Sequence, residues 1–325
     1  MRPPEFWSRP PARPGLIARL LSPLGFVYGR VVKARLKRTP AYRPGAPVIC
    51  IGNLTLGGAG KTPVAIAILQ RLAAMRASPV ALSRGYGGAA QGPVKVEPDH
   101  RASEVGDEPL LLARHAPTIV AKDRAAGARA AMEAGADVIV MDDGFQNPSL
   151  PKDLAIAVVD SETGFGNGRV FTAGPLREAA KDGLARADAV ILMGRGPFDP
   201  GHPVTLRAQL RAPLAATFDD RRVVAFAGIG RPEKFYQSMQ RAGADIIAVF
   251  SYPDHYAYTD DDIQRMKALA RSRGAALATT EKDYVRLPPA LRKGVLTLPV
   301  EAQFEDERAL DALLQRALAR AEHSL

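Results

Sequence analysis

The sequence feature that most constrains this chain is a glycine-rich loop that joins an apolar run to a helical pattern. Residues 48–62 read VICIGNLTLGGAGKT, and a helical pattern follows, with Pro63 near its first position. An apolar strand that leads through glycines and Lys-Thr into a helix is the local structure of a phosphate-binding P-loop. Short apolar runs of this kind indicate a parallel sheet that helices cover on both faces. The loop therefore predicts an α/β fold.

The residues of this loop predict how a nucleotide binds. Glycine N–H groups wrap the phosphates, a lysine reaches the β and γ oxygens, and a hydroxyl coordinates Mg²⁺. Thr55 stands where the usual G-x-x-x-x-G-K-[ST] pattern has its first glycine. The alternative is a glycine-rich turn that only connects a strand to a helix. We expect nucleotide contacts from the following residues: Thr55, Gly57, Gly58, Ala59, Gly60, Lys61 and Thr62.

A second apolar run ends in two acids. Residues 138–146 read VIVMDDGFQ, so Asp142 and Asp143 directly follow a predicted strand. A P-loop enzyme holds its metal with an acid of this kind. The alternative is a solvated turn, because strands often end in Asp. We expect Thr62, Asp142 and Asp143 to hold Mg²⁺, and the sequence leaves open which of the two acids touches the metal.

The order of the other elements predicts two α/β domains, 46–215 and 216–325. A chain of 325 residues has room for two domains of about 150 residues each. Alternation in VTLRAQL, residues 204–210, predicts an exposed strand pair near the boundary. The first domain is expected to contain strands 48–51, 80–83, 118–121, 138–141, 154–159 and 189–193 and helices 62–77, 109–115, 124–134 and 178–186. The second is expected to contain strands 223–227, 246–250 and 276–279 and helices 232–242, 260–273 and 306–321.

Basic residues concentrate at the N-terminus. The chain carries 44 Lys and Arg against 34 Asp and Glu. Residues 1–45 contain ten of the basic residues and one of the acids, which leaves a nearly balanced 34 and 33 for the rest. This distribution argues against a nucleic-acid-binding surface spread over the body of the protein. The single cysteine, Cys50, excludes a disulfide framework and a multi-cysteine metal site.

The same segment predicts a helix at a membrane surface. Residues 15–36 mix apolar side chains with Lys and Arg, and the longest charge-free stretch, 20–29, has ten residues. A transmembrane helix needs about 20 apolar residues, so this segment is too short to span a bilayer. An amphipathic helix within residues 1–45 that lies on an anionic membrane fits better. The alternative is an ordinary helix that packs on the domain with a solvated basic face.

Several motifs, taken together, resemble those of the tetraacyldisaccharide 4'-kinase family. In chain order they are GNLTLGGAGKTP (52–63), SRGYGG (83–88), VGDEP (105–109), DDGFQ (142–146), FGNGRVFTAGPLRE (165–178), PDHYAY (253–258) and TTEKD (279–283). The family pattern tolerates Thr at position 55. The resemblance implies that ATP, with Mg²⁺, phosphorylates the 4'-hydroxyl of a tetraacyldisaccharide 1-phosphate to give lipid IVA.

The resemblance also implies an architecture and a location. It implies a P-loop core with a mostly parallel sheet and a smaller C-terminal α/β domain that closes over the site and is joined to the core by a two-stranded linker. The N-terminal segment resembles the membrane-associating helix of the family. We therefore expect a peripheral protein on the cytoplasmic face of the bacterial inner membrane, with a lipid substrate and with neither nucleic acid nor an obligate protein partner.

Two residues of these motifs resemble the family's proton-transfer groups and join Lys61 as expected catalytic residues. A sugar hydroxyl is a poor nucleophile at neutral pH, so a positioned base accelerates its attack. Asp107 matches the family's proposed base, although an Asp ahead of a Pro-led helix is also typical of an N-cap. His255 matches the histidine that orients this aspartate, although a loop histidine taken alone is commonly incidental. Because the two residues lie in different predicted domains, the pair forms only when the domains approach each other.

Other residues of the motifs have less specific expected roles. Glu178, with Arg177, is expected to reach the metal or the phosphates, and an exposed helix start is the alternative. Arg84 is expected to contact a phosphate, and residues 281–283 are expected to contact the nucleotide. A P-loop ATPase that acts as a membrane-docked switch is the rival function. Its usual second lysine is missing, because Leu56 stands at that position.

Overall fold

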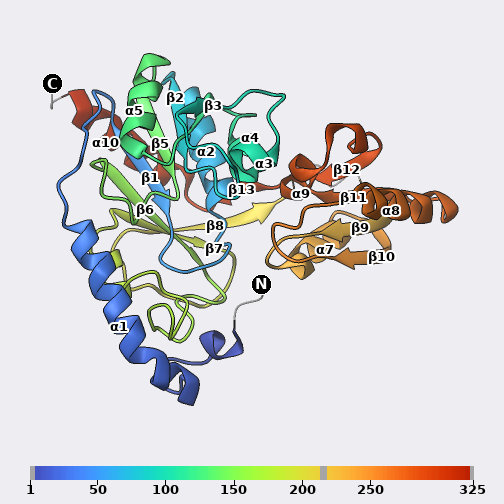
Figure 1. The fold of residues 1–325 in the computed structure, drawn as a ribbon, viewed down its shortest axis with the longest axis horizontal. Helices are drawn as coiled ribbons and strands as arrows, with labels where there is room; N and C mark the ends of the chain where they lie inside the picture. Colours follow the sequence, from blue (N-terminus) through green and yellow to red (C-terminus); the bar gives the residue numbers. More distant parts are fainter. Residues whose placement is uncertain (1–3, 213–217, 323–325) are drawn as a thin grey trace.

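The described residues of the computed structural model, 4–212 and 218–322, form two β-sheets (Figure 1). The larger sheet has nine strands in the order β13-β8-β7-β6-β1-β5-β2-β4-β3. The smaller sheet has four, in the order β10-β9-β11-β12, and lies at one end of the molecule. The strands at the centre of the larger sheet pair in parallel. The expected α/β fold is therefore confirmed.

The helices and strands expected from the sequence are present in the expected order, and their ends differ from the expected ends by a few residues. The larger sheet contains β1 (Val48–Gly52), β2 (Pro79–Ser83), β3 (Val94–Lys95), β4 (Thr118–Val120), β5 (Val138–Asp142), β6 (Leu154–Asp160), β7 (Ala189–Met193), β8 (Thr205–Arg211) and β13 (Glu301–Phe304). Its helices are α2 (Lys61–Ala74), α3 (Ala102–Val105), α4 (Asp107–Leu112), α5 (Arg124–Glu133), α6 (Ala180–Leu184) and α10 (Glu307–Glu322). The smaller sheet contains β9 (Arg222–Ala227), β10 (Asp245–Ser251), β11 (Ala276–Thr280) and β12 (Val295–Leu298), with helices α7 (Pro232–Arg241), α8 (Asp260–Ser272), α9 (Glu281–Arg286) and the 3₁₀ helix η3 (Pro289–Leu291). The shorter elements β3, α3, α9, η3, β12 and β13 were not among those expected.

The centre of the larger sheet is parallel because its strands are apolar on both faces. β1 lies between β5 and β6 and pairs in parallel with each. Ile49 and Ile51 enter a core with α2 and α10, whereas Val48 and Cys50 enter the opposite core with α5. Such strands have no place for charged side chains until they end. Polar groups therefore collect in the loops beyond the strand ends.

The end of the chain returns to the larger sheet, which corrects the expected domain division. β13 pairs antiparallel with β8, and Leu310 and Leu314 of α10 pack in the core that contains α2. Residues 301–322 thus belong with the first domain and not with the expected domain 216–325. β8 is also not part of a local exposed pair, because it lies between β7 and β13 inside the sheet. Its second partner follows the whole C-terminal domain in the chain, so no local pattern reveals the pairing. Residues 213–217 of the expected pair lie outside the described residues.

The C-terminal domain is a small parallel α/β unit. β9 pairs in parallel with β10 and β11, and β11 pairs in parallel with β12. Alternate residues of β9 point into separate cores: Val223 packs with Phe235 of α7, and Val224 packs with Met266 of α8. β8 leads toward this domain and β13 leads back (Figure 1). The two antiparallel strands therefore form the link between the domains.

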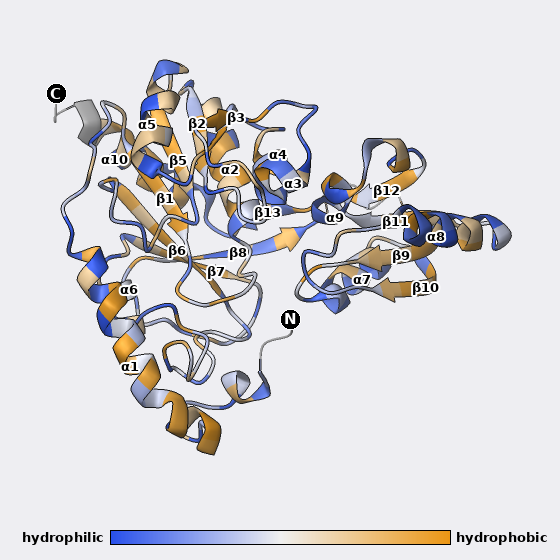
Figure 2. Ribbon diagram, viewed as in Figure 1, coloured by the Kyte–Doolittle hydropathy of each residue, from blue (hydrophilic) through white to orange (hydrophobic). Residues whose placement is uncertain are grey.

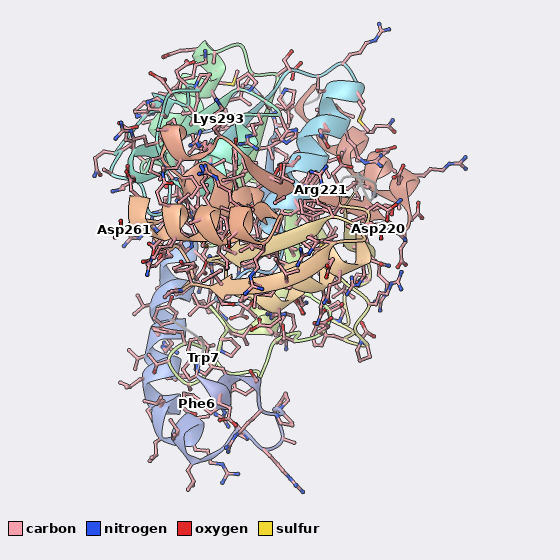
Figure 3. All side chains as sticks on the ribbon, turned by 90° about the vertical axis from the view of Figure 1, so that its right-hand side faces the viewer. Phe6, Trp7, Asp220, Arg221, Asp261 and Lys293 are labelled. Carbon is pink, nitrogen blue, oxygen red and sulfur yellow. The ribbon has the colours of Figure 1, made fainter. Side chains whose placement is uncertain are left out.

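The N-terminal helix α1 (Leu16–Leu36) lies along one side of the first domain and leaves much of its apolar surface exposed (Figure 2). Leu16 and Leu20 are 76% and 78% exposed. The helix contacts the 165–175 loop, where Arg169 donates to the Ser22 hydroxyl (2.7 Å). Phe6 and Trp7, in the 3₁₀ helix η1 (Glu5–Ser8), lie beside α1 away from the C-terminal domain (Figure 3). Among the described residues, no helix is long and apolar enough to cross a bilayer.

The packing of α10 predicts that it stabilises the first domain. Leu314 is fully buried in the core with α2. Truncation of a buried Leu to Ala costs about 2–5 kcal/mol, so Leu314→Ala is expected to lower the free energy of unfolding by that amount in urea titrations. Gln315→Ala, an exposed neighbour on the same helix, is the matched control. Equal unfolding midpoints for the two variants would contradict the assignment of α10 to this domain.

Candidate active site

The candidate site lies where the carboxyl ends of three adjacent strands meet the C-terminal domain. The loop 53–60 follows β1, Asp142 ends β5, and Ser83 ends β2. The loop after β2 packs on the start of α4, where Gly85 lies against Val105, and α9 of the C-terminal domain packs on α4. Ligands of open α/β sheets bind beyond this edge. The arrangement brings residues of both domains to the same edge.

The glycine-rich loop has an open outer face. Gly57 and Gly60 have positive φ angles, 113° and 87°, which only glycine adopts readily. A Cβ added at Gly57 or Gly58 would meet no described atom within 4 Å, so a ligand can approach the backbone here. Gly60 is the N-cap of α2, which directs the helix N-terminus and its partial positive charge toward the loop. The loop therefore has the geometry of an anion-binding site.

A buried asparagine shapes this loop from inside. The Asn53 side-chain amide donates to the carbonyl oxygens of Thr55 (2.7 Å) and Gly57 (3.2 Å). The ammonium of Lys61 lies 3.4 Å from Asn53 Oδ1. Asn53 thus fixes the loop and orients the lysine. Asn53 was not among the residues expected from the sequence. Its position directly after a buried strand is nevertheless a sequence signal for a site residue.

The two adjacent acids at the end of β5 occupy opposite electrostatic environments. Burial raises the pKa of Asp142 to about 7, with a further contribution from the neighbouring Asp143 carboxylate. Asp142 Oδ1 is buried without a hydrogen-bond partner among the described residues. Burial also acts to raise the pKa of Asp143. Its Oδ1, however, lies 3.6 Å from Lys61 Nζ and 2.9 Å from Arg177 Nη1, and these two cations outweigh the effect of burial and hold the pKa below its usual value.

The unpartnered Asp142 oxygen fits a divalent cation. Mg²⁺ prefers oxygen ligands and is commonly held by one or two carboxylates together with substrate phosphates. Thr62, at the second position of α2, adds a hydroxyl at the start of the helix that follows the glycine-rich loop. Asp143 is already paired with Arg177 and Lys61. The donor set of Asp142 and Thr62 therefore suits Mg²⁺ bound beside the phosphates of a nucleotide.

Glu178 belongs to a different network. Its carboxylate is buried, and both oxygens contact the Arg186 guanidinium, with the closest pair 2.7 Å apart. The Gln146 side-chain amide also donates to Glu178 (2.9 Å) and to the Asn53 carbonyl (3.0 Å). Glu178 precedes α6 and is not exposed, so the exposed-helix-start alternative is wrong. Because Arg186 neutralises it, the structure gives no support to Glu178 as a metal ligand.

The first residue of α4, Asp107, is the meeting point of the two domains. Its side chain is only 3% exposed, and Arg286 Nε donates to Oδ2 at 2.7 Å. His255 Nδ1 lies 3.2 Å and Lys282 Nζ 3.8 Å from the same oxygen. Burial raises the pKa of Asp107, but His255, Lys282 and Arg286 outweigh it and hold this pKa well below its usual range. Gly106 occupies the N-cap position, so the N-cap alternative for Asp107 is wrong.

The backbone and a tyrosine hold His255 in place. Its φ is 58°, in the left-handed region, and its N–H donates to the Gly228 carbonyl (3.2 Å). The exposed ring of Tyr86, from the SRGYGG loop, lies edge-on to the imidazole at 5.4 Å. His255 and Asp107 are therefore brought together from different domains, as expected from the sequence.

Four further basic residues lie at or near the site, and two of them were not expected from the sequence. Lys282, expected at the nucleotide, instead pairs with Glu108 of the first domain (2.8 Å). Arg84 is exposed at the end of β2. Arg124, which was not expected, is buried and interacts electrostatically with Asp142. Arg286 could not be predicted either, because nothing in its local sequence indicates a partner in the other domain.

Comparisons with known proteins identify the relatives of this chain. A family model described as tetraacyldisaccharide-1-P 4'-kinase matches residues 17–319. A relative from Methylorubrum extorquens, named tetraacyldisaccharide 4'-kinase, is 49% identical over 332 residues, covering 99% of this chain and 100% of its own. A protein of the same name from Methylobacterium nodulans is 52% identical and covers 98% of this chain and 96% of its own.

A solved structure has the same fold. The crystal structure of the "apo" form of LpxK from Aquifex aeolicus, in complex with ATP, superposes with a TM-score of 0.77. The sequence identity is 28%, and the match covers 93% of this chain and 100% of that chain. The similarity therefore includes both domains.

The opposite environments of the two acids predict opposite effects on stability. Asp142 has a pKa of about 7 in the folded protein against 3.8 unfolded, so its ionisation lowers stability as the pH rises between these values. Without Mg²⁺, Asp142→Asn is expected to raise the Tm above pH 7 and to have little effect below pH 3.8. Asp143→Asn is the matched control. Because the Asp143 pKa is lowered, that variant is expected to lower the Tm at neutral pH. Equal Tm values for both variants and the wild type across this range would contradict the assignment.

Proposed function

The chain belongs to the tetraacyldisaccharide-1-P 4'-kinase family, and from this premise we propose that it transfers the γ-phosphoryl group of ATP to the 4'-hydroxyl of a tetraacyldisaccharide 1-phosphate. The acceptor oxygen forms a bond to the γ-phosphorus while the bond from that phosphorus to the β–γ bridging oxygen breaks. The hydroxyl proton goes to a base, and ADP leaves. The product is the 4'-phosphorylated lipid, lipid IVA. The observation that carries this proposal is the family match over nearly the whole chain.

The glycine-rich loop and the acids after β5 have the roles of nucleotide and metal ligands in this proposal. Phosphoryl transfer depends mainly on positioning and on neutralisation of phosphate charge. Lys61 and the loop N–H groups bind the β and γ phosphates. Thr62 and Asp142 hold Mg²⁺, which neutralises phosphate charge when it is bound. Asp143 keeps its contacts with Lys61 and Arg177, so its role is to orient the lysine.

Asp107 is the proposed base, and His255 its partner. The strongly lowered pKa keeps Asp107 ionised at neutral pH, so it is ready to accept a proton. Its low basicity is compatible with a loose transition state, in which the hydroxyl proton leaves late. His255 Nδ1 lies 3.2 Å from Asp107 Oδ2, and with its proton on this nitrogen it donates to the carboxylate and fixes it. Since the two domains supply one residue each, the pair forms in the closed arrangement, which also excludes water.

Helix α1 supports a peripheral location at the membrane that holds the lipid substrate. Its exposed apolar residues include Leu16, Leu20, Phe26 and Val31, and basic residues flank them. A surface helix of this kind inserts its apolar side chains at the acyl boundary and places its Lys and Arg near anionic head groups. We propose that the protein binds the cytoplasmic face of the inner membrane, where ATP is available.

Loss of the loop lysine or of the base predicts loss of lipid phosphorylation. Lys61→Met removes a cation from the phosphates and is expected to lower kcat by at least about 100-fold. Asp107→Asn removes the proton acceptor and is expected to lower kcat by about 10²–10⁴-fold while ATP still binds. The measurement is transfer of the γ-phosphoryl group to detergent-solubilised lipid acceptor, with the exposed Lys95→Met as the control. Rapid ATP hydrolysis that is independent of the lipid would instead favour the membrane-docked switch.

The exposed face of α1 predicts how the protein meets a membrane. Leu20→Glu places a charge at the most exposed apolar residue of this face and is expected to weaken sedimentation with phosphatidylglycerol-containing vesicles several-fold. The fold is expected to persist because Leu20 is already exposed. Gln240→Glu, on an exposed position of α7, adds the same charge elsewhere and is expected to bind like the wild type. If both variants bound vesicles equally, α1 would not be the membrane contact.

A further inference from the structure

Arg286 occupies a position that the proposed chemistry leaves unexplained. It is the last residue of α9, and its side chain is 6% exposed. Nε and Nη2 both donate to Asp107 Oδ2 in the other domain. Nη1 points the other way and donates to Asp283 Oδ1 (2.9 Å) and to the Gly228 carbonyl (2.6 Å). A single guanidinium therefore bridges two buried carboxylates, one from each domain.

The carboxylate behind Arg286 is fixed on every side. Asp283 is fully buried and accepts hydrogen bonds from the Gly228 N–H (3.0 Å), the Tyr258 hydroxyl (2.9 Å) and the Thr280 hydroxyl (2.6 Å). A buried ion pair is stabilising only when its remaining hydrogen bonds are satisfied, and here the groups around Asp283 satisfy them. Asp283 thus holds the guanidinium rigidly before it meets Asp107.

The Gly228 carbonyl, which holds Arg286, also holds His255. The Gly228 carbonyl accepts from Arg286 Nη1 and from the His255 N–H (3.2 Å). The side chains of both residues then reach Asp107 Oδ2. Oδ1 of Asp107 accepts from the Glu108 N–H at 3.0 Å, so it keeps a lone pair for a substrate hydroxyl. The cationic groups gather at Oδ2, whereas the hydrogen bond to Oδ1 comes from a backbone N–H.

We propose that Arg286 is the positioning residue that sets Asp107 for catalysis: anchored by Asp283, it holds Oδ2 beside His255 and turns Oδ1 toward the acceptor. This inference rests on the proposed function, because it presumes that Asp107 receives the hydroxyl proton. Arg286 touches no reacting atom and acts through Asp107. Gly228, Tyr258 and Asp283 hold Arg286, directly or through hydrogen bonds to one another, so residues of the C-terminal domain determine the position of the proposed base.

The charges around Asp107 predict what loss of Arg286 does. The groups that face it are His255 from the PDHYAY loop, Lys282 and Arg286 from α9, and Glu108 from its own helix. Without Arg286 the buried carboxylate loses its closest cation, so its pKa rises. The acidic limb of the kcat profile, which reports protonation of the base, should then move to higher pH.

Kinetics of two substitutions test this inference in the full-length protein. Arg286→Met is expected to lower kcat by about 100-fold, the effect of misplacing a catalytic group by about 1 Å. The KM for ATP should stay within about twofold, because Arg286 lies outside the nucleotide loop. Arg286→Lys keeps the charge and is expected to recover part of kcat and most of the acidic limb. Arg292→Met is the matched control, since Arg292 donates to the Val285 and Leu287 carbonyls within its own domain.

The outcomes separate this inference from the proposed function. The position of the acidic limb does not depend on how much protein is folded, so it remains informative if Arg286→Met is unstable. The inference would be overturned if Arg286→Met had the same kcat and the same acidic limb as Arg292→Met. It would also be overturned if Arg286→Met had a lower kcat but an unmoved acidic limb and Arg286→Lys recovered none of the activity. An active Asp107→Asn would overturn the proposed base as well. An inactive Asp107→Asn beside a fully active Arg286→Met would overturn the positioning role alone.

Discussion

The buried carboxylate of Asp107 depends on charges that its own domain does not supply. Arg286, Lys282 and His255 all come from the C-terminal domain and all approach the same oxygen. A buried carboxylate that loses its partner costs several kcal/mol. The ion pair therefore couples the relative position of the two domains to the ionisation of the proposed base. Other cross-domain pairs, Lys282 with Glu108 and Arg231 with Asp160, support the same arrangement.

The two acids after β5 lie in different electrostatic environments. Asp142 is buried and one of its carboxylate oxygens has no hydrogen-bond partner among the described residues. Its negative charge is therefore unfavourable without a partner, and the carboxylate is well suited to bind a cation. Asp143, one residue on, has a positive φ that turns it toward Lys61 and Arg177. Two identical side chains thus differ in pKa because the strand ends between them. Such divergence is typical of functional sites.

Much of the fold and part of the site could be predicted because their determinants are local. The apolar strands, the glycine-rich loop and the acids after β5 each occupy a short continuous segment. The pairing of β8 with β13 could not be predicted in this way, since the whole C-terminal domain lies between the two strands in the chain. The contacts of Glu178 could not be predicted for a similar reason. Its carboxylate looked available in the sequence, whereas Arg186 neutralises it in the folded protein.

The sequence by itself determined the nucleotide loop, the α/β class and the apolar, basic character of the N-terminal helix. Each follows from the order of residues within one segment, because backbone conformation and the burial pattern of a strand or helix are set locally. Only the tertiary structure decided where α10 packs, which oxygen of Asp107 is occupied, and that Arg286 joins Asp107 to Asp283. Long-range ion pairs and burial depend on how the chain folds back, and no single segment records that.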